Sequence, residues 1–256
     1  MIDSRAVIDP GAELADDVSV GPYSVIGPDV QIGPGCRIGP HVVINGPTRI
    51  GANNRIYQFA SLGDAPQDKK YGGEPTRLEI GDNNTIREYV TINRGTVQDQ
   101  GVTRVGDDNW IMAYVHIAHD CQVGSHTIFA NNASLAGHVR IEDHVILGGY
   151  TLVHQFCALG RYSFTAYATG LSRDVPPFVT VSGMPAHPHG LNTEGLRRHG
   201  FSPEAIRALK RAYRTLYRSK LTLEQALVRL REQAKESPEV GIMVEFLERQ
   251  QRGIVR

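Results

Sequence analysis

An aliphatic residue recurs at every sixth position through most of this 256-residue chain. The series runs from Ile8 to Ile56, stays in phase from Ile80 to Ile92, and resumes, shifted by one residue, from Val105 to Leu159. This period matches neither the helical turn of about 3.6 residues nor the simple alternation of a strand. It indicates short strands joined by tight corners, where the glycine that often follows the aliphatic residue would supply unusual backbone dihedrals.

Three such strands would close a triangular coil of about 18 residues, and coils would stack at about 4.8 Å, the spacing of paired strands. Each coil would cover the hydrophobic face of the one before it, as in other solenoid proteins. The sequence therefore predicts a mainly β fold, a parallel β-helix of hexapeptide repeats over residues 1–190. The spacing alone leaves the hand of this helix open.

From about Leu191 the pattern changes to that of a small α-helical domain, residues 191–256. Ser202 and Ser237 are each followed by proline, which is typical of a helix N-cap and first turn. Thr222 and Gln225 have the spacing of a capping box. We therefore expect three helices of about 10 to 16 residues each.

Basic residues are concentrated at the start of this helical region. Eight lysines and arginines lie between Arg197 and Lys220, against one acid, Glu204. Such a concentration in a neutral chain indicates a docking surface for an acidic partner. A solvated helix face is the alternative, and the salt dependence of binding would separate the two.

Composition excludes several other classes of function. Lysine plus arginine equals aspartate plus glutamate, 27 each, so the overall charge gives no argument for nucleic acid. No run approaches the roughly 18 apolar residues of a membrane span, and we expect a cytoplasmic protein without an integral membrane segment. Cys36, Cys121 and Cys157 all fall in an inward slot of the repeat, so we expect buried packing residues and no disulfides.

The repeat is interrupted twice. A polar stretch rich in glycine and proline occupies residues 63–76, and we interpret it as a binding loop, with a tolerated insertion as the alternative. A shorter break at residues 98–101 causes the shift of one residue. For this second break, a binding loop and a tolerated insertion are equally supported by the sequence.

The stretch Val115–Asp120 holds two histidines and a carboxylate, and only Ile117 occupies an aliphatic slot. In an unbroken β-helix residue i lies beside residue i+18, which places Gly137 and then Gln155 in line with His119. The same rule sets His138 beside Asp120, and His154 beside Ala136. A histidine next to a carboxylate, with an accessible glycine amide alongside, is suited to general-base acyl transfer.

Two other functions remain open on these residues. Clustered histidines bind zinc, so a carbonic-anhydrase-like hexapeptide metalloenzyme is one alternative. A solenoid scaffold without catalysis is another. The carboxylate, glycine and glutamine around His119 favour acid–base chemistry, and we expect no metal and no cofactor.

The chain resembles the acyl-carrier-protein-dependent UDP-N-acetylglucosamine 3-O-acyltransferases of lipid A biosynthesis, the LpxA family, essentially from end to end. The matching segments include Ile56–Ala60, Gly73–Arg77, Arg94–Thr96, His116–Asp120, Asn131–Ala133, Leu135–Val139, Val153–Phe156 and Gly195–Arg198. The resemblance implies a left-handed helix, a homotrimer with sites between subunits, and an acyl carrier protein bearing a 3-hydroxyacyl thioester as donor to UDP-N-acetylglucosamine.

The resemblance also implies residue roles. His119 is similar to the general base, Asp120 to its partner, and Gly137 to the oxyanion donor. Positions similar to the family's sugar or acyl contacts are Gln67, Asp68, Lys70, His116, His138, His154 and Gln155. Asn192, Glu194 and Arg198 match positions at the nucleotide end.

Three positions depart from the family pattern. His199 stands where many members have a second arginine, and Asn93 replaces a frequent histidine. Tyr167 occupies the position of the acyl-length ruler, where glycine admits a longer chain. Because packed apolar grooves reject extra methylenes, we expect a donor shorter than that of the glycine-bearing members.

Overall fold

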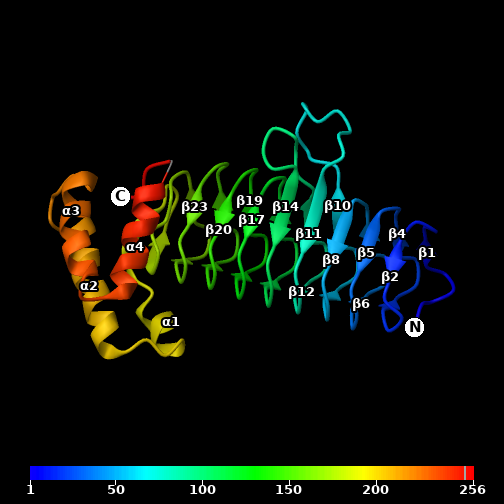
Figure 1. Ribbon diagram of the computed structural model, residues 1–256, viewed down its shortest axis with the longest axis horizontal. Helices are drawn as coiled ribbons and strands as arrows, with labels where there is room; N and C mark the ends of the chain where they lie inside the picture. The colour runs from blue at the N-terminus through cyan, green and yellow to red at the C-terminus, as the bar shows by residue number, and fades with distance from the viewer. Residues whose placement is uncertain (251) are drawn as a thin grey trace.

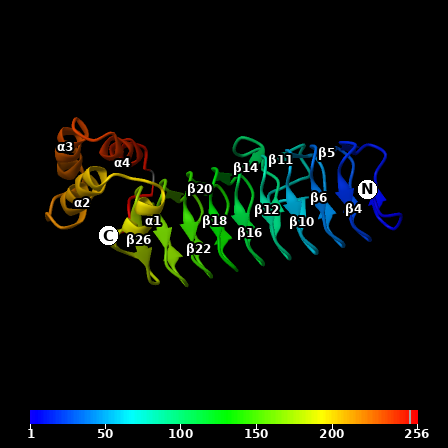
Figure 2. The same ribbon diagram turned by 90° about the horizontal axis from the view of Figure 1, so that it is seen from below.

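Each hexapeptide forms one short strand, and the strands build three sheets that enclose a triangular prism. All pairs are parallel except the last one of the third sheet, at the C-terminal end. The computed structural model describes residues 1–250 and 252–256. The prism is a left-handed parallel β-helix, and helices gather at its C-terminal end (Figures 1 and 2). None of the described helices is both long and apolar enough to cross a membrane.

The chain passes through the three faces of the prism in turn. The first face contains β1 (Val7–Ile8), β4 (Val25–Ile26), β7 (Val43–Ile44), β10 (Ser61–Asp64), β13 (Thr91–Asn93), β16 (His116–Ile117), β19 (Ser134–Leu135), β22 (Leu152–Val153) and β25 (Gly170–Leu171). The second contains β2 (Glu13–Leu14), β5 (Val30–Ile32), β8 (Thr48–Ile50), β11 (Arg77–Ile80), β14 (Val102–Val105), β17 (Gln122–Val123), β20 (Arg140–Ile141) and β23 (Ala158–Leu159). The third contains β3 (Ser19–Val20), β6 (Arg37–Ile38), β9 (Arg55–Ile56), β12 (Thr85–Ile86), β15 (Trp110–Ile111), β18 (Ile128–Phe129), β21 (Ile146–Leu147), β24 (Phe164–Thr165), β26 (Val179–Ser182) and β27 (His187–Leu191).

The register between coils is the one that the repeat predicts. His116 pairs with Ser134, which pairs with Leu152, so neighbouring residues differ by 18. From Val20 to Leu159 every aliphatic residue of the series is buried, while Ile8 and Leu14 are half-buried because little covers the first coil. The three cysteines are also fully buried and free. Burial raises the pKa of Cys121 to about 12 and that of Cys157 to about 11, which suits packing residues and not nucleophiles.

Two details of the expected repeat were wrong. The glycines after the aliphatic residues are required for close stacking: a Cβ on Gly33 would lie 2.8 Å from the carbonyl of Gly51. Positive φ falls on non-glycine corner residues instead, for example Asn53 at 56°. The repeat also continues past Leu159, because Thr165 fills an inward slot and its hydroxyl lies 2.7 Å from that of Thr151.

The helical region has one more helix than expected. α2 (Pro203–Tyr217), α3 (Leu223–Ala234) and α4 (Pro238–Arg249) begin at the three proposed caps, and Thr222 and Gln225 form the capping box. The additional helix is α1 (Thr193–Arg198), which is capped by Asn192. Because β27 ends at Leu191 and α1 begins at Thr193, the structure changes class there, although the domain boundary itself stays a prediction.

Candidate active site

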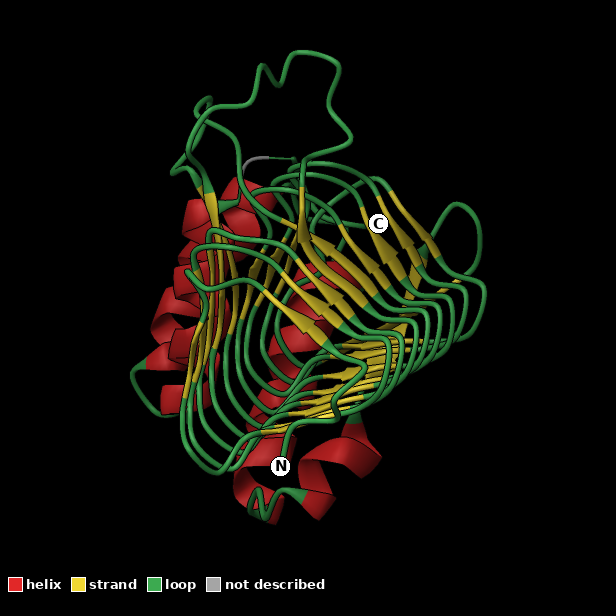
Figure 3. Cartoon of the chain, turned by 90° about the vertical axis from the view of Figure 1, so that its right-hand side faces the viewer, coloured by secondary structure: helices red, strands yellow, loops and turns green. Residues whose placement is uncertain are grey.

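The two insertions leave the prism at the same corner, which we call the first corner because it joins the first face to the second. The longer insertion, residues 65–76, connects β10 to β11, and the shorter, residues 94–101, connects β13 to β14. Both loops project together from the prism (Figures 1 and 3). The next coil along this corner is the one that contains His119 and Asp120.

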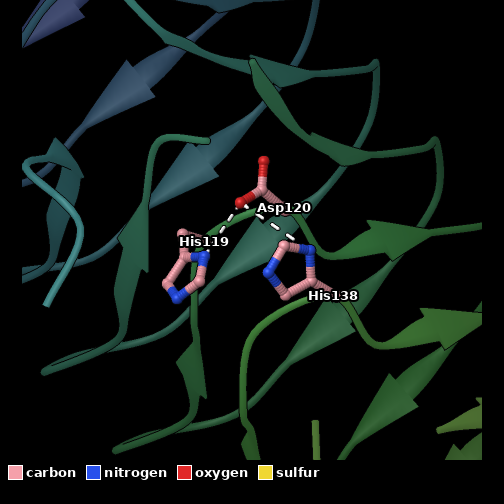
Figure 4. Close-up of side chains that lie close together, drawn as sticks. All are labelled: His119, Asp120 and His138. Atoms are coloured by element: carbon pink, nitrogen blue, oxygen red, sulfur yellow. Dashed lines mark hydrogen bonds and ion pairs between the residues drawn. The ribbon is translucent and has the colours of Figure 1, made fainter. Parts of the chain in front are cut away.

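His119 and Asp120 form a hydrogen-bonded pair at the turn between β16 and β17. His119 Nδ1 lies 2.8 Å from Asp120 Oδ2. A dashed line marks this interaction in Figure 4. The Asp120 side chain is about 1% exposed, whereas that of His119 is 16% exposed. The carboxylate is therefore held inside the protein, while the imidazole can still meet a substrate.

Asp120 remains ionised despite its burial because several donors surround it. Its carboxylate accepts hydrogen bonds from the backbone N–H of Thr96 at 2.9 Å and from the Thr96 hydroxyl at 2.6 Å. Burial opposes ionisation, but these bonds and the one from His119 outweigh it and lower the pKa of Asp120. A charged carboxylate in this position orients His119 and favours a proton on Nδ1, which leaves Nε2 able to act as a base.

Gly137 lies against the edge of the His119 ring that contains Nε2. A Cβ at position 137 would stand 2.6 Å from His119 Cε1 and 2.8 Å from Nε2. Among the described residues, none accepts a hydrogen bond from the Gly137 N–H. An unpaired amide donor therefore sits beside the candidate base, where a developing oxyanion could bind.

The remaining histidines of this corner differ in their partners. The His138 and His119 rings meet edge to face with centroids 5.1 Å apart, so the expected neighbourhood is found there. His154 and Gln155 follow on the next coil and are exposed, and neither forms a hydrogen bond or ring contact with His119. His154 Nδ1 instead lies 3.4 Å from the guanidinium of Arg252, a residue of the C-terminal segment that the repeat could not place.

His116 lies on β16, on the first face, one turn before His119. Its Nδ1 is 2.7 Å from the hydroxyl of Thr91 on the preceding coil. Burial lowers the pKa of His116, and the nearby His119 lowers it further to a smaller extent. The neutral imidazole is thereby favoured, which suits a hydrogen-bonding contact to a substrate.

The long insertion holds Gln67, Asp68 and Lys70 above the first corner. The carboxylate of Asp68 accepts a hydrogen bond from the Lys70 N–H at 3.0 Å. Gln67 and Lys70 are exposed, and Asp68 is half-buried. Arg94 fixes the base of the loop through the Tyr71 hydroxyl at 3.1 Å and the Gly63 carbonyl at 2.9 Å. Asn93, which replaces the frequent histidine, is also used here, donating to the Ala65 carbonyl at 3.0 Å.

The other predicted residues lie at different corners of the same chain. Glu194 and Arg198 belong to α1, and Asn192 is its N-cap. The helix is followed by His199 at the second corner, between the second and third faces. There the His199 ring lies edge-on to His144 and Tyr162, at 4.8 and 5.2 Å. Tyr167 stands at the third corner, between β24 and β25, with 77% of its surface exposed. One chain therefore does not bring His119 together with α1 or Tyr167.

Three potential metal ligands do come together in one place among the described residues. Single donor atoms of His119, Asp120 and His138 lie within 4.8 Å of one another. The Nδ1 atoms of both histidines face carboxylate oxygens, those of Asp120 and Asp99. The set therefore works as a hydrogen-bonded cluster, although its composition is one that zinc accepts.

Comparisons with known proteins agree with this geometry. The protein-family model described as "Bacterial transferase hexapeptide (six repeats)" matches residues 11–46, 29–64 and 103–137. A second family model, "Udp N-acetylglucosamine O-acyltransferase; Domain 2", matches residues 174–255. The coiled prism and its histidine–aspartate pair thus define a hexapeptide-repeat acyltransferase. The chain is 64% identical to the acyl-[acyl-carrier-protein]–UDP-N-acetylglucosamine O-acyltransferase of Azotobacter vinelandii and 60% identical to that of Thiobacillus denitrificans, with 100% of this chain and 99% of each relative covered. It belongs to the UDP-N-acetylglucosamine O-acyltransferase family.

Solved structures give the same result for the whole chain. The structure of LpxA from Acinetobacter baumannii has a TM-score of 0.97 at 50% identity, covering 100% of this chain and 99% of that one. UDP-N-acetylglucosamine acyltransferase from Francisella novicida has a TM-score of 0.98 at 44% identity, covering 100% and 94%. The family resemblance and the fold expected from the sequence are thereby confirmed, and a non-catalytic scaffold is not favoured.

Proposed function

We propose that this chain transfers an (R)-3-hydroxyacyl group from acyl carrier protein to the 3-hydroxyl of UDP-N-acetylglucosamine, the first step of lipid A biosynthesis. The observation that supports it most directly is the His119–Asp120 pair at 2.8 Å, with the unpaired Gly137 N–H beside His119 Nε2. The relatives whose names describe this reaction match the chain over its full length.

The proposed mechanism uses His119 first as a base and then as an acid. Nε2 removes the proton of the sugar 3-hydroxyl while the hydroxyl oxygen attacks the thioester carbonyl carbon. Asp120 stabilises the imidazolium that forms. The tetrahedral oxyanion accepts a hydrogen bond from the Gly137 N–H. As the carbon–sulfur bond breaks, Nε2 returns the proton to the thiolate, which releases the free thiol of the carrier. The sugar and acyl groups would be held around this centre by the corner residues His116, His138, His154 and Gln155 and by the loop residues Gln67, Asp68 and Lys70.

The direct test is an acyl-transfer assay with UDP-N-acetylglucosamine and a panel of 3-hydroxyacyl carrier proteins. We expect His119→Ala to lose at least about 100-fold in kcat, the usual scale for a general base. The variant should fold normally, because the ring it loses is partly exposed. Comparable turnover by wild type and variant would exclude His119 as the base.

We propose further that the active enzyme is a homotrimer in which the site is completed by a second copy. His119 lies at the first corner and Asn192, Glu194 and Arg198 lie by the second, so one chain cannot offer both to a single ligand. A neighbour related by a closed symmetry axis can present its second corner to the first corner of the next chain.

Mixing two inactive variants tests this arrangement. His119→Ala and Arg198→Ala chains, refolded together, should regain activity, because about a quarter of randomly assorted interfaces have both intact residues. Light scattering should give three chains per particle. Wild-type-like activity in a monomer, or no recovery on mixing, would contradict a shared site.

Two accompanying proposals concern location and metal. Since acyl carrier protein and nucleotide sugars are cytoplasmic reactants, we propose a cytoplasmic enzyme. The metalloenzyme alternative is kept only because His119, Asp120 and His138 cluster. Full activity after treatment with a chelator, together with no metal in elemental analysis, would exclude it.

A further inference from the structure

The shorter insertion, residues 94–101, is attached directly to the buried carboxylate of the site. Thr96 donates both its N–H and its hydroxyl to Asp120. The loop is closed on itself by the hydrogen bond from the Gly101 N–H to the Thr96 carbonyl at 3.0 Å. It is fastened to its surroundings by Gln100, whose side chain accepts a hydrogen bond from Arg104 at 3.1 Å. The insertion is thus fixed on both sides of Asp99.

Asp99 points from this loop to His138. Its Oδ2 lies 2.9 Å from His138 Nδ1, whereas Asp120 Oδ2 lies farther from the same nitrogen, at 3.9 Å. The other side of the His138 ring stacks on Phe156 at a centroid distance of 4.5 Å. His138 is 15% exposed and Asp99 is 38% exposed. The ring is therefore packed on one side and hydrogen-bonded at one nitrogen.

We propose that Asp99 is a positioning residue for acyl transfer, acting through His138. This inference rests on the proposed function of the first corner. A carboxylate only accepts hydrogen bonds, so its contact fixes a proton on His138 Nδ1. Nε2 of the neutral ring is then an acceptor, oriented for a hydroxyl or amide N–H of the bound substrate. The site thus contains two parallel pairs, Asp120 with His119 and Asp99 with His138.

The first test is kinetic and uses a matched control in the same loop. We expect Asp99→Ala to lower kcat/KM about tenfold, as carboxylates that orient functional histidines commonly do. Gln98→Ala should leave it unchanged, because Gln98 is exposed and its side chain forms no hydrogen bond with the described residues. Equal melting temperatures of both variants would show that the loop remains folded.

A double-mutant cycle then shows whether Asp99 acts through His138. If it does, Asp99→Ala combined with His138→Ala should be no slower than His138→Ala alone, because residues in one network are not additive. A further tenfold loss in the double variant would overturn the proposal. So would an Asp99→Ala enzyme indistinguishable from the Gln98→Ala control.

The tautomer of His138 gives a readout that does not depend on turnover. In ¹⁵N-histidine NMR of the whole protein, His138, assigned by its absence in His138→Gln, should be protonated at Nδ1. Asp99→Ala should shift it toward the Nε2-protonated form, while Gln98→Ala should not. An unchanged tautomer would refute the positioning role even if His119 proves to be the base. A His119→Ala enzyme with wild-type turnover, together with the expected tautomer shift in Asp99→Ala, would refute only the proposed mechanism.

Discussion

The imidazole of His119 rests on Gly137 of the next coil, with room for a hydrogen atom but not for a methyl group. A Cβ on Gly137 would approach Cε1, Nε2 and Nδ1 of the ring to 2.6, 2.8 and 3.2 Å. Contacts under 3.0 Å force one partner to move, and the partner here is the proposed base, whose Nδ1 is bonded to Asp120. The stacking register therefore imposes glycine at this position for a chemical reason.

The first prediction concerns this glycine. Gly137→Ala should displace His119 and lower kcat by about 10- to 100-fold, the usual cost of misplacing a reacting group by about 1 Å. The KM for both substrates should change less. Steady-state kinetics and the melting temperature measure the two effects separately.

Gly241→Ala is the matched control because a Cβ there would meet nothing within 4 Å. Gly241 lies inside α4, where alanine should raise the free energy of unfolding by about 1 kcal/mol. Its activity should equal that of wild type. A Gly137→Ala enzyme with wild-type kcat would show that the ring has space to retreat.

The repeat allowed much of the site to be predicted because every residue in it has a slot. The i+18 rule placed Gly137 beside His119, and the structure contains that contact. Ile117 and Cys121 are fully buried, as their slots required. In such a solenoid the fixed repeat determines which residues lie next to each other on neighbouring coils. The residue that stacks on a motif can therefore be predicted from its residue number.

The rule fails wherever the chain leaves the coils. Thr96 and Asp99 lie in an insertion of irregular length, so no spacing could predict that they would reach Asp120 and His138. α1 has only six residues, and Asn192 was a predicted ligand contact but not a recognised N-cap. The corner on which α1 lies depends on β26 and β27, where the coil ends in an antiparallel pair.

The second prediction concerns pH and His116. Its pKa in the folded protein is below the ordinary value of 6.5, so the unfolded chain binds more protons just below that pH. The stability contributed by neutral His116 is full above pH 6.5 and is lost as the pH falls through the folded-state pKa. Denaturant unfolding at about pH 7.5 and about pH 5 should therefore show wild type losing more stability than His116→Gln, by up to about 1.4 kcal/mol per pH unit.

Thr91→Val provides the control for this effect. It removes the hydroxyl that lies 2.7 Å from His116 Nδ1 but keeps the buried ring, so its stability should still fall with pH. If wild type and His116→Gln lose stability in parallel, His116 does not contribute to the acid sensitivity.

The third prediction concerns donor length. Tyr167 is exposed at the third corner of the chain, and we propose that a groove shared with a second copy ends there. Tyr167→Gly should shift the preferred acyl donor to a longer chain, because each buried methylene is worth about 0.8 kcal/mol. Competition between carrier proteins loaded with different chain lengths measures the shift.

Tyr150→Gly is the appropriate comparison. Tyr150 lies at the same corner one coil earlier, is 59% exposed, and has a φ of 58° that glycine accepts. Its chain-length profile should remain that of wild type. If neither variant gains activity with longer donors, the ruler lies elsewhere.

The fourth prediction concerns the basic surface, which we define as the exposed residues Arg207, Lys210, Arg211, Arg214 and Arg218 of α2 and its C-cap. The opposite side of α2 packs against the helical core through Leu209 and Leu216, so these cations face away from it. Arg207 is paired with Glu204, and all five side chains remain exposed to an acidic carrier protein. Lys210→Glu with Arg214→Glu should raise the KM for acyl carrier protein at least tenfold, with little change in the KM for UDP-N-acetylglucosamine.

Added salt should weaken the wild-type interaction in the same selective way, because exposed charges are screened within about 10 Å at 0.1 M. Arg37→Glu with Arg55→Glu, on β6 and β9 of the third face, changes the net charge equally at two exposed positions. It should leave the carrier KM near the wild-type value. Equal effects of the two charge reversals would mean that overall charge, and not this surface, governs docking.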